Sequence, residues 1–145
     1  MAVTAYWYGN ALLKALNKEI DWNSDTIKIA LCTSSYTPDQ DTHDYYDDIT
    51  NELTTTGGYT AGGATLANCA VTYTAGTNVI KLDADDVTWS ALTATFRYAV
   101  IYLSTGTAAT SPLIGYVNLD TDRTASGEDY TIQWSADGIL KATVS

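Results

Sequence analysis

The sequence predicts a mainly β fold, either an antiparallel β-sandwich or a jelly-roll-like barrel, with one or two short N-terminal helices. Three observations lead to this prediction. Apolar and β-branched residues alternate with a period of two in several short runs. Tyrosine, with 11 copies, and threonine are frequent, and both suit pleated, half-buried surfaces. Turn-forming glycines separate the runs at fairly even spacing: Gly76, Gly106, Gly127 and Gly138.

Length and charge bound the organisation of the chain. We expect a single domain, 1–145, because a chain of this length with 46% hydrophobic residues can bury a core. The net charge is −10 and the seven basic residues do not cluster, which argues against nucleic acid and membranes as partners. The sequence shows no signal-peptide pattern and no apolar run of about 18 residues, so we expect folding in a cytoplasm.

The N-terminal part comprises an aromatic arm, 1–9, and a short helix, 10–20. Strong helix formers fill the second segment, and Asn10 is a suitable N-cap. An apolar stripe at helical spacing predicts an amphipathic helix, with the members Leu12, Leu13, Leu16 and Ile20.

The β-sandwich is expected to occupy 26–145 and to be organised around a central strand at 94–103. From Tyr98 onward both faces of this run are apolar or aromatic, which indicates a strand covered on both sides. A second apolar run, 112–119, follows a polar loop, and we expect an antiparallel pair. One face of the central strand is expected to carry Phe96, Tyr98, Val100 and Tyr102.

Shorter elements complete the predicted sandwich. Alternating aliphatic residues predict a strand at 26–33, and 34–53 is an acidic insertion made of turns or a short helix. The remaining predicted strands are 65–74, 78–83, 87–89, 130–134 and 139–144, the last two joined as a hairpin at 136–138.

The two cysteines, Cys32 and Cys69, both fall in predicted strands among apolar residues. We interpret them as buried free thiols that behave as small hydrophobic side chains. A disulfide would require their strands to be adjacent, which the sequence does not establish.

The single histidine, His43, is the first place to look for catalysis or metal binding. Zinc sites need further histidine or cysteine ligands, and nucleophilic catalysis needs an activated serine or cysteine; no motif supplies either. We therefore interpret the segment as a solvated acidic loop and predict no catalytic residues and no enzyme activity. The acidic neighbours are Asp39, Asp41, Asp44, Asp47 and Asp48.

Carboxylates at nearby positions make Asp120, Asp122 and Glu128 the candidate ligands of a surface calcium ion. This segment resembles the opening of an EF-hand loop, but Ala125 stands where that loop requires glycine, and no helices flank it. A second acidic run at 83–86 has the same character. We predict no metal site and no cofactor.

Aromatic residues indicate a surface role instead. Tyrosine and tryptophan bury a large area while keeping a polar group, and both are frequent in interfaces. Tyr6, Trp7 and Tyr8 are therefore the candidate partner-binding residues. Two alternatives stay open: the arm folds back onto its own sheet, or it docks on a neighbouring subunit.

Several stretches together resemble a family of small tailed-bacteriophage and prophage virion proteins, some of them similar to capsid decoration (cement) proteins. The similarity covers about 10–135 and depends on order and spacing rather than on a chemical motif. Its stretches are 20–22 with 25–31, 36–39 with 42–44, 47–49, 84–89, 99–102, 105–107 and 111–116.

The resemblance implies a non-enzymatic structural protein of a virion and carries over no catalytic residue. Our leading hypothesis is a homotrimeric decoration protein on the capsid surface, bound to the major capsid protein or other virion proteins and stabilising the assembled head. A tail, neck or fibre component is the alternative. A carbohydrate-binding module is a further one, because tyrosine and tryptophan platforms suit sugar stacking.

Overall fold

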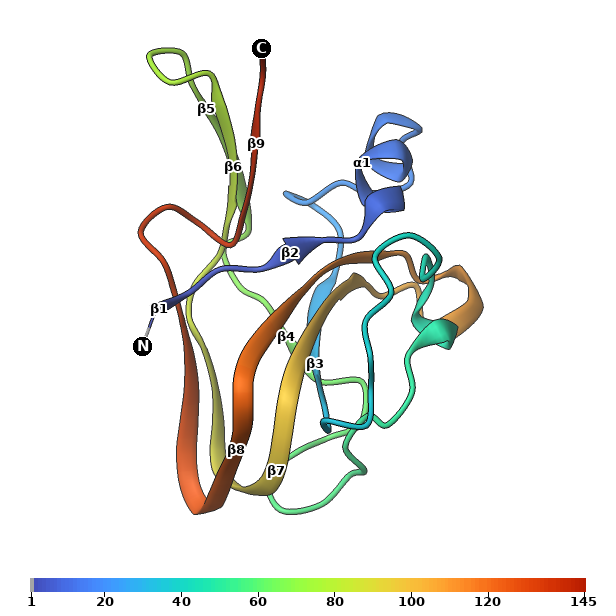
Figure 1. Cartoon of the computed structure of the whole chain (residues 1–145), viewed down its shortest axis with the longest axis vertical. Helices are drawn as coiled ribbons and strands as arrows, with labels where there is room; N and C mark the ends of the chain where they lie inside the picture. Colours follow the sequence, from blue (N-terminus) through green and yellow to red (C-terminus); the bar gives the residue numbers. More distant parts are fainter. Residues whose placement is uncertain (1) are drawn as a thin grey trace.

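The structure is a computed structural model that describes residues 2–145 (Figure 1). It is mainly β, as predicted, and the described sheets are sandwich-like and do not close into a barrel. The elements in chain order are β1 (Ala2–Val3), β2 (Tyr6–Trp7), α1 (Gly9–Leu16), β3 (Ile27–Cys32), the 3₁₀ helix η1 (Tyr46–Asp48), β4 (Ala64–Thr65), β5 (Ala70–Thr74), β6 (Val79–Asp83), β7 (Val87–Leu103), the 3₁₀ helix η2 (Ala108–Thr110), β8 (Leu113–Trp134) and β9 (Leu140–Thr143).

Two sheets make up the fold. The larger sheet has the order β1-β8-β7-β3-β4, and β2 also pairs with β8. The smaller sheet has the order β5-β6-β9 and projects from the body near α1, at the top of Figure 1. The predicted hairpin between 130–134 and 139–144 is wrong, because the turn closed by Gly138 N–H and the Ser135 carbonyl sends β9 to β6.

The predicted central strand is confirmed. β7 lies between β3 and β8, and Ala99 is opposite Leu31 on one side and Val117 on the other. The pairing with β8 is antiparallel, as expected. The runs at 87–89 and 94–103 are parts of this one strand, and those at 112–119 and 130–134 are parts of β8.

The two long strands curve sharply at the bottom of Figure 1, where the alternating sequence pattern is interrupted. The register shifts between Trp89 and Leu92 and again between Leu92 and Thr93, where Gly127 on β8 has a φ of 81°. Gly58, with a φ of 82°, packs against this bend, and a Cβ there would lie 2.5 Å from the Ser90 carbonyl oxygen. The close approach therefore requires glycine.

The prediction that Phe96 shares a face with Tyr98 is wrong, because the register shifts again between these two residues. Because a bulge reverses the alternation, Phe96 points to the opposite face from Tyr98. Phe96 is fully buried, and its ring meets Tyr130 edge-on at 4.8 Å between centroids.

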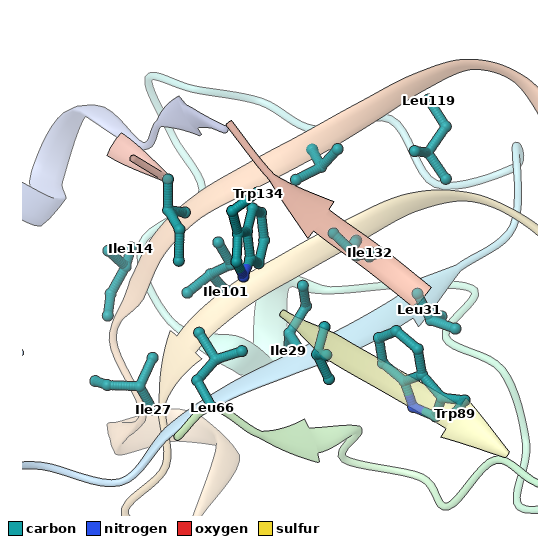
Figure 2. Close-up of a cluster of buried hydrophobic side chains, with 14 of the residues drawn as sticks. Ile27, Ile29, Leu31, Leu66, Trp89, Ile101, Ile114, Leu119, Ile132 and Trp134 are labelled. Atoms are coloured by element: carbon teal, nitrogen blue, oxygen red, sulfur yellow. The ribbon is translucent and has the colours of Figure 1, made fainter. Parts of the chain in front are cut away.

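Hydrophobic clusters cover both faces of the central sheet, as its apolar strands predicted. The first, the aliphatic core, is made mainly of branched aliphatic and tryptophan side chains, several of them drawn in Figure 2. The second, the tyrosine core, lies beneath the acidic segment 34–53. Its buried members are Tyr8, Ala30, Cys32, Tyr36, Val100, Tyr102 and Leu113.

The helix α1 is shorter than predicted. It ends at Leu16, because Lys18 has a φ of 66° and cannot continue it. Tyr8 rather than Asn10 is the N-cap residue. No helix in residues 2–145 is both long and apolar enough to cross a membrane.

The cysteines are free, as expected, but their surroundings differ. Cys32 is buried in β3, whereas Cys69 is half-buried and lies before β5, outside any strand. The predicted strand 65–74 is interrupted there because Asn68 adopts a left-handed conformation, with a φ of 53°.

Candidate interaction surface

The aromatic arm folds back onto its own sheet. β1 pairs in parallel with the end of β8, and β2 pairs antiparallel with its beginning, so that Tyr6 is opposite Tyr116. The three candidate residues separate here: Tyr6 is 58% exposed, Trp7 is half-buried and Tyr8 is fully buried. Only the first of them offers an open face to a partner in this conformation.

Hydrogen bonds fix the arm to the acidic segment. The Tyr8 and Tyr36 hydroxyls are 2.7 Å apart, and Tyr36 in turn lies 3.0 Å from His43 Nδ1. Gln40 Nε2 donates to the Trp7 carbonyl at 2.6 Å, and the Gln40 carbonyl accepts from Gly9 N–H at 2.8 Å. The acidic segment 34–53 therefore holds the arm in position.

The single histidine, His43, takes part in this contact between the acidic segment and the arm. The Asp39 N–H donates to His43 Nδ1 at 3.2 Å, so this nitrogen is an acceptor and the ring proton resides on Nε2. The Tyr36 ring stacks on the imidazole, with 5.7 Å between centroids. These contacts give His43 a structural position.

The aspartates around His43 are engaged in turns. The Asp48 carboxylate accepts the Asp44 N–H at 2.9 Å, which lowers the pKa of Asp48, and Asp39 caps the turn at Asp41 and Thr42. Across residues 2–145, no three histidine, cysteine, aspartate or glutamate side chains form a group that could hold a metal ion.

The candidate calcium ligands lie on the curved part of β8. Asp122 forms an ion pair with Arg97 across the strands at 2.9 Å, and the Asp120 N–H donates to Asn118 Oδ1 at 2.8 Å. Glu128 is exposed opposite Leu92. The described structure does not bring these three carboxylates together as a metal site.

The buried nucleophilic and phenolic groups are held in their neutral forms. Burial raises the pKa of Cys32 to about 12, and that of Tyr102 to about 12. Burial, followed by the nearby Glu52 carboxylate, raises the pKa of Tyr59. Neutral, packed side chains of this kind stabilise a fold and are poor nucleophiles.

A different surface stands out: the apolar end, formed by α1 and the small sheet at the top of Figure 1. Residues 2–145 include seven exposed large hydrophobic side chains; six of them lie there, and Tyr6 is the seventh. Leu16 is 84% exposed. The six are Leu12, Leu13, Leu16, Val71, Tyr73 and Val144.

The helix contributes these leucines because it packs in an unusual orientation. An amphipathic helix ordinarily turns its apolar stripe toward the core. In α1 the buried residues are instead Ala11 and Lys14. Lys14 Nζ pairs with Asp44 Oδ2 at 3.1 Å and lies 3.4 Å from the centroid of the Tyr45 ring, so a cation–π contact and an ion pair hold this face inward.

The small sheet is amphipathic, and its apolar face turns toward α1. Cross-strand pairs Val71–Leu82 and Tyr73–Ile80 belong to this face. Burial decreases toward its tip, from 8% exposure at Leu82 to 40% at Val71 and 56% at Tyr73. The base of the face thus belongs to the core, and its tip is open.

An open groove of about 600 Å³ lies between the helix and this face. It is mostly apolar. Lys18 and Asp21, of opposite charge, are its charged lining residues, and its apolar lining includes Leu12, Ala15, Val71, Ile80 and Leu82.

This surface does not follow from the sequence pattern. The alternation in 70–83 and the leucines at helical spacing predict the strands and the helix. The pattern of one segment does not reveal whether another segment covers its apolar side. The seventh exposed residue, Tyr6, was predicted as a contact residue, but from composition alone.

Comparison with protein families, with curated proteins and with solved structures finds no match to this chain.

Proposed function

We propose that this chain is a non-enzymatic structural protein of a bacteriophage virion, and that it decorates the assembled head. It would bind the major capsid protein on the outer capsid surface as a homotrimer, after synthesis in the host cytoplasm. The observation that carries the proposal is the apolar end, where six large hydrophobic side chains gather on an otherwise acidic molecule. Exposed apolar patches of this kind mark interaction sites.

The rest of the molecule supports a structural role. Hydrophobic clusters cover the central sheet on both faces, and its two long strands, β7 and β8, pair with each other. The buried thiol and phenols are held neutral, so the chemistry in the described residues favours packing over catalysis. The resemblance to phage virion proteins is the reason for proposing a virion as the assembly to which the chain belongs.

A decoration protein stabilises a head by mass action. Because it binds the assembled lattice and not free capsid subunits, its binding free energy adds to the stability of the shell. A trimer suits this role, since capsid lattices present threefold positions. The acidic exterior away from the apolar end would keep the free protein soluble.

The proposal is tested on virions of the phage or prophage that encodes the chain. Antibodies raised against the purified protein would be used for immunogold labelling, with virions from a strain lacking the gene as control. We expect gold on the head surface and peptides of the chain in the mass spectrum of purified particles. Virions lacking the protein should release DNA at lower temperature.

Other labelling patterns would change the conclusion. Gold confined to the tail or neck would support the alternative of a tail component and overturn decoration. Purified virions without any peptide of the chain would overturn a virion role altogether, and a glycan array with the same protein would then test the carbohydrate-binding alternative.

A further inference from the structure

The apolar end contains two shapes that differ. Leu13 and Leu16 project from α1 as a ridge that does not line the groove. The groove lies beside it, between α1 and the open tip of the small sheet. One end of the molecule therefore presents both an apolar projection and an apolar recess.

The face of the small sheet, rather than its edge, is the part left open. A sheet edge can accept another strand through its free backbone groups. At β5, however, the outward Val71 N–H already bonds Asn23 Oδ1 at 3.0 Å. Strand addition at this residue would have to break that bond, whereas the apolar side chains on the face are free to contact a partner.

Charge favours a second copy at this end. The charged residues that α1, the segment after it and the groove face of the small sheet leave exposed there are Lys18, Glu19 and Asp21, a net charge of −1, whereas the whole chain has −10. Identical chains repel one another through their acidic surfaces, but contact through this nearly neutral end reduces that repulsion. Lys14 is buried beside Asp44, and Lys81 and Lys141 lie on the opposite face of the small sheet.

The groove itself is suited to self-association. Lys18 and Asp21 line it with opposite charges, and neither is in an ion pair within the described chain. When identical ends meet, Lys18 of one copy can face Asp21 of the other. The contact thus offers electrostatic complementarity at the rim of an apolar centre, as stable interfaces do.

We propose that the Leu13–Leu16 ridge of one copy docks into the groove between α1 and the small sheet of a second copy. Because ridge and groove lie on the same end, each copy can use both at once, and we expect the contact to close a dimer or a trimer around a symmetry axis rather than to continue as a filament. It buries Leu16, the most exposed large hydrophobic side chain in residues 2–145, and it does not depend on the proposed virion role.

Light scattering on the purified full chain tests the contact. We expect a mass of two or three times 15.6 kDa, and Leu16→Glu and Leu16→Lys should each weaken association about tenfold or more. Because the side chain is 84% exposed in a single chain, these substitutions should leave the fold itself intact, as an unchanged far-UV circular dichroism spectrum would show; a lower unfolding temperature would reflect the lost association. Thr121→Glu, an exposed position on β8, is the matched control and should leave the mass unaltered.

Disulfide trapping tests the geometry. In a Cys69→Ser background, a Leu16→Cys chain is mixed with a Val71→Cys chain and oxidised mildly. We expect the mixed dimer, which joins one chain of each variant, to exceed the Leu16→Cys self-dimer at least severalfold, since the ridge meets the groove and not another ridge. Cys32 is buried and should stay unreacted.

Three outcomes would overturn the proposal. The first is a monomer at all concentrations. The second is an oligomer that neither Leu16 variant weakens. The third is predominant trapping of ridge to ridge. A monomer whose Leu16→Glu variant loses virion binding would assign the ridge to a virion partner instead, so failure here and failure of the proposed function are distinguishable.

Discussion

The two hydrophobic clusters on either side of the central sheet are built on different principles. The aliphatic core fills space with branched side chains and tryptophans, and its polar atoms are few. The tyrosine core encloses phenols whose hydroxyls form hydrogen bonds. The Tyr8 hydroxyl bonds that of Tyr36, and the Tyr102 hydroxyl donates to the Gly62 carbonyl at 2.6 Å. Tyr46 and Tyr102 also stack, with 4.0 Å between ring centroids.

The two clusters have different tasks: the aliphatic core stabilises the fold, and the tyrosine core fixes the positions of loops. Aliphatic packing contributes much free energy but does not require specific partner atoms, so it suits the interior of the sandwich. Hydrogen-bonded phenols contribute less free energy, but each one fixes the position of a particular loop. The tyrosine core accordingly lies where the arm and the acidic segment must be held, and the aliphatic core lies between the layers.

The largest expected effect comes from opening the aliphatic core. Phe96→Ala removes a fully buried ring that packs edge-on against Tyr130, and it should lower the free energy of unfolding by about 3–5 kcal/mol. Urea denaturation followed by far-UV circular dichroism measures this. Phe96→Leu keeps most of the volume and should lose less; equal losses for both variants would contradict a packing role.

A smaller effect is expected in the tyrosine core. Tyr36→Phe keeps the ring but leaves the Tyr8 hydroxyl and His43 Nδ1 without their shared partner, at about 1–3 kcal/mol. Amide hydrogen exchange should accelerate in the arm and in 36–43 more than in β7. Tyr98→Phe, half-buried in the same cluster, is the control. Faster exchange spread evenly over the molecule would show that the Tyr36 hydroxyl stabilises the whole fold and does not specifically fix the arm and 36–43.

The acidic segment should weaken first as pH falls. Because the Asp44 N–H stabilises the Asp48 carboxylate, the folded-state pKa of Asp48 lies below its ordinary 3.8. Its contribution to stability is therefore complete above about pH 4 and is lost as pH falls through the folded pKa. Melting temperatures of the natural chain and Asp48→Asn should differ by a few degrees at pH 7 and converge near pH 2. A constant difference would argue against this carboxylate.

The smallest effect is expected on the solvent face of the sheet. The Thr95 and Thr124 hydroxyls are 3.0 Å apart across β7 and β8 and are exposed. Thr124→Ala should change the free energy of unfolding by no more than about 0.5 kcal/mol, because water replaces the lost partner. Urea denaturation provides the measurement, and a loss as large as that of Tyr36→Phe would show that this face is not merely solvated.

The central strands could be predicted from the sequence because alternation reports burial on each face of a strand. The strands at 26–33 and 94–103 are present, and the expected antiparallel partner follows. The facing of Phe96 could not be predicted, since a bulge is set by the partner strand and leaves little trace in the sequence. The same holds for β9, whose partner depends on a turn and on a strand far along the chain.

The candidate surface was the least predictable part. Leu12, Leu13 and Leu16 have helical spacing, but Lys14, through Asp44 and Tyr45, determines which side of the helix is buried. These partners lie some thirty residues away in a loop, so a local pattern does not contain them. The arm was predicted as two alternatives, and pairing with β8 shows that it folds back, with Tyr8 inside the chain.

The pairing of the arm with β8 also determines the order in which the chain can fold. Ala2 is opposite Gln133, so β1 has no partner until residue 133 has been synthesised. Contacts between residues so far apart in the sequence slow folding, because the long loop between them must be closed first. We therefore expect the arm to settle only after β7 and β8 have paired, with its aromatic residues unprotected until then.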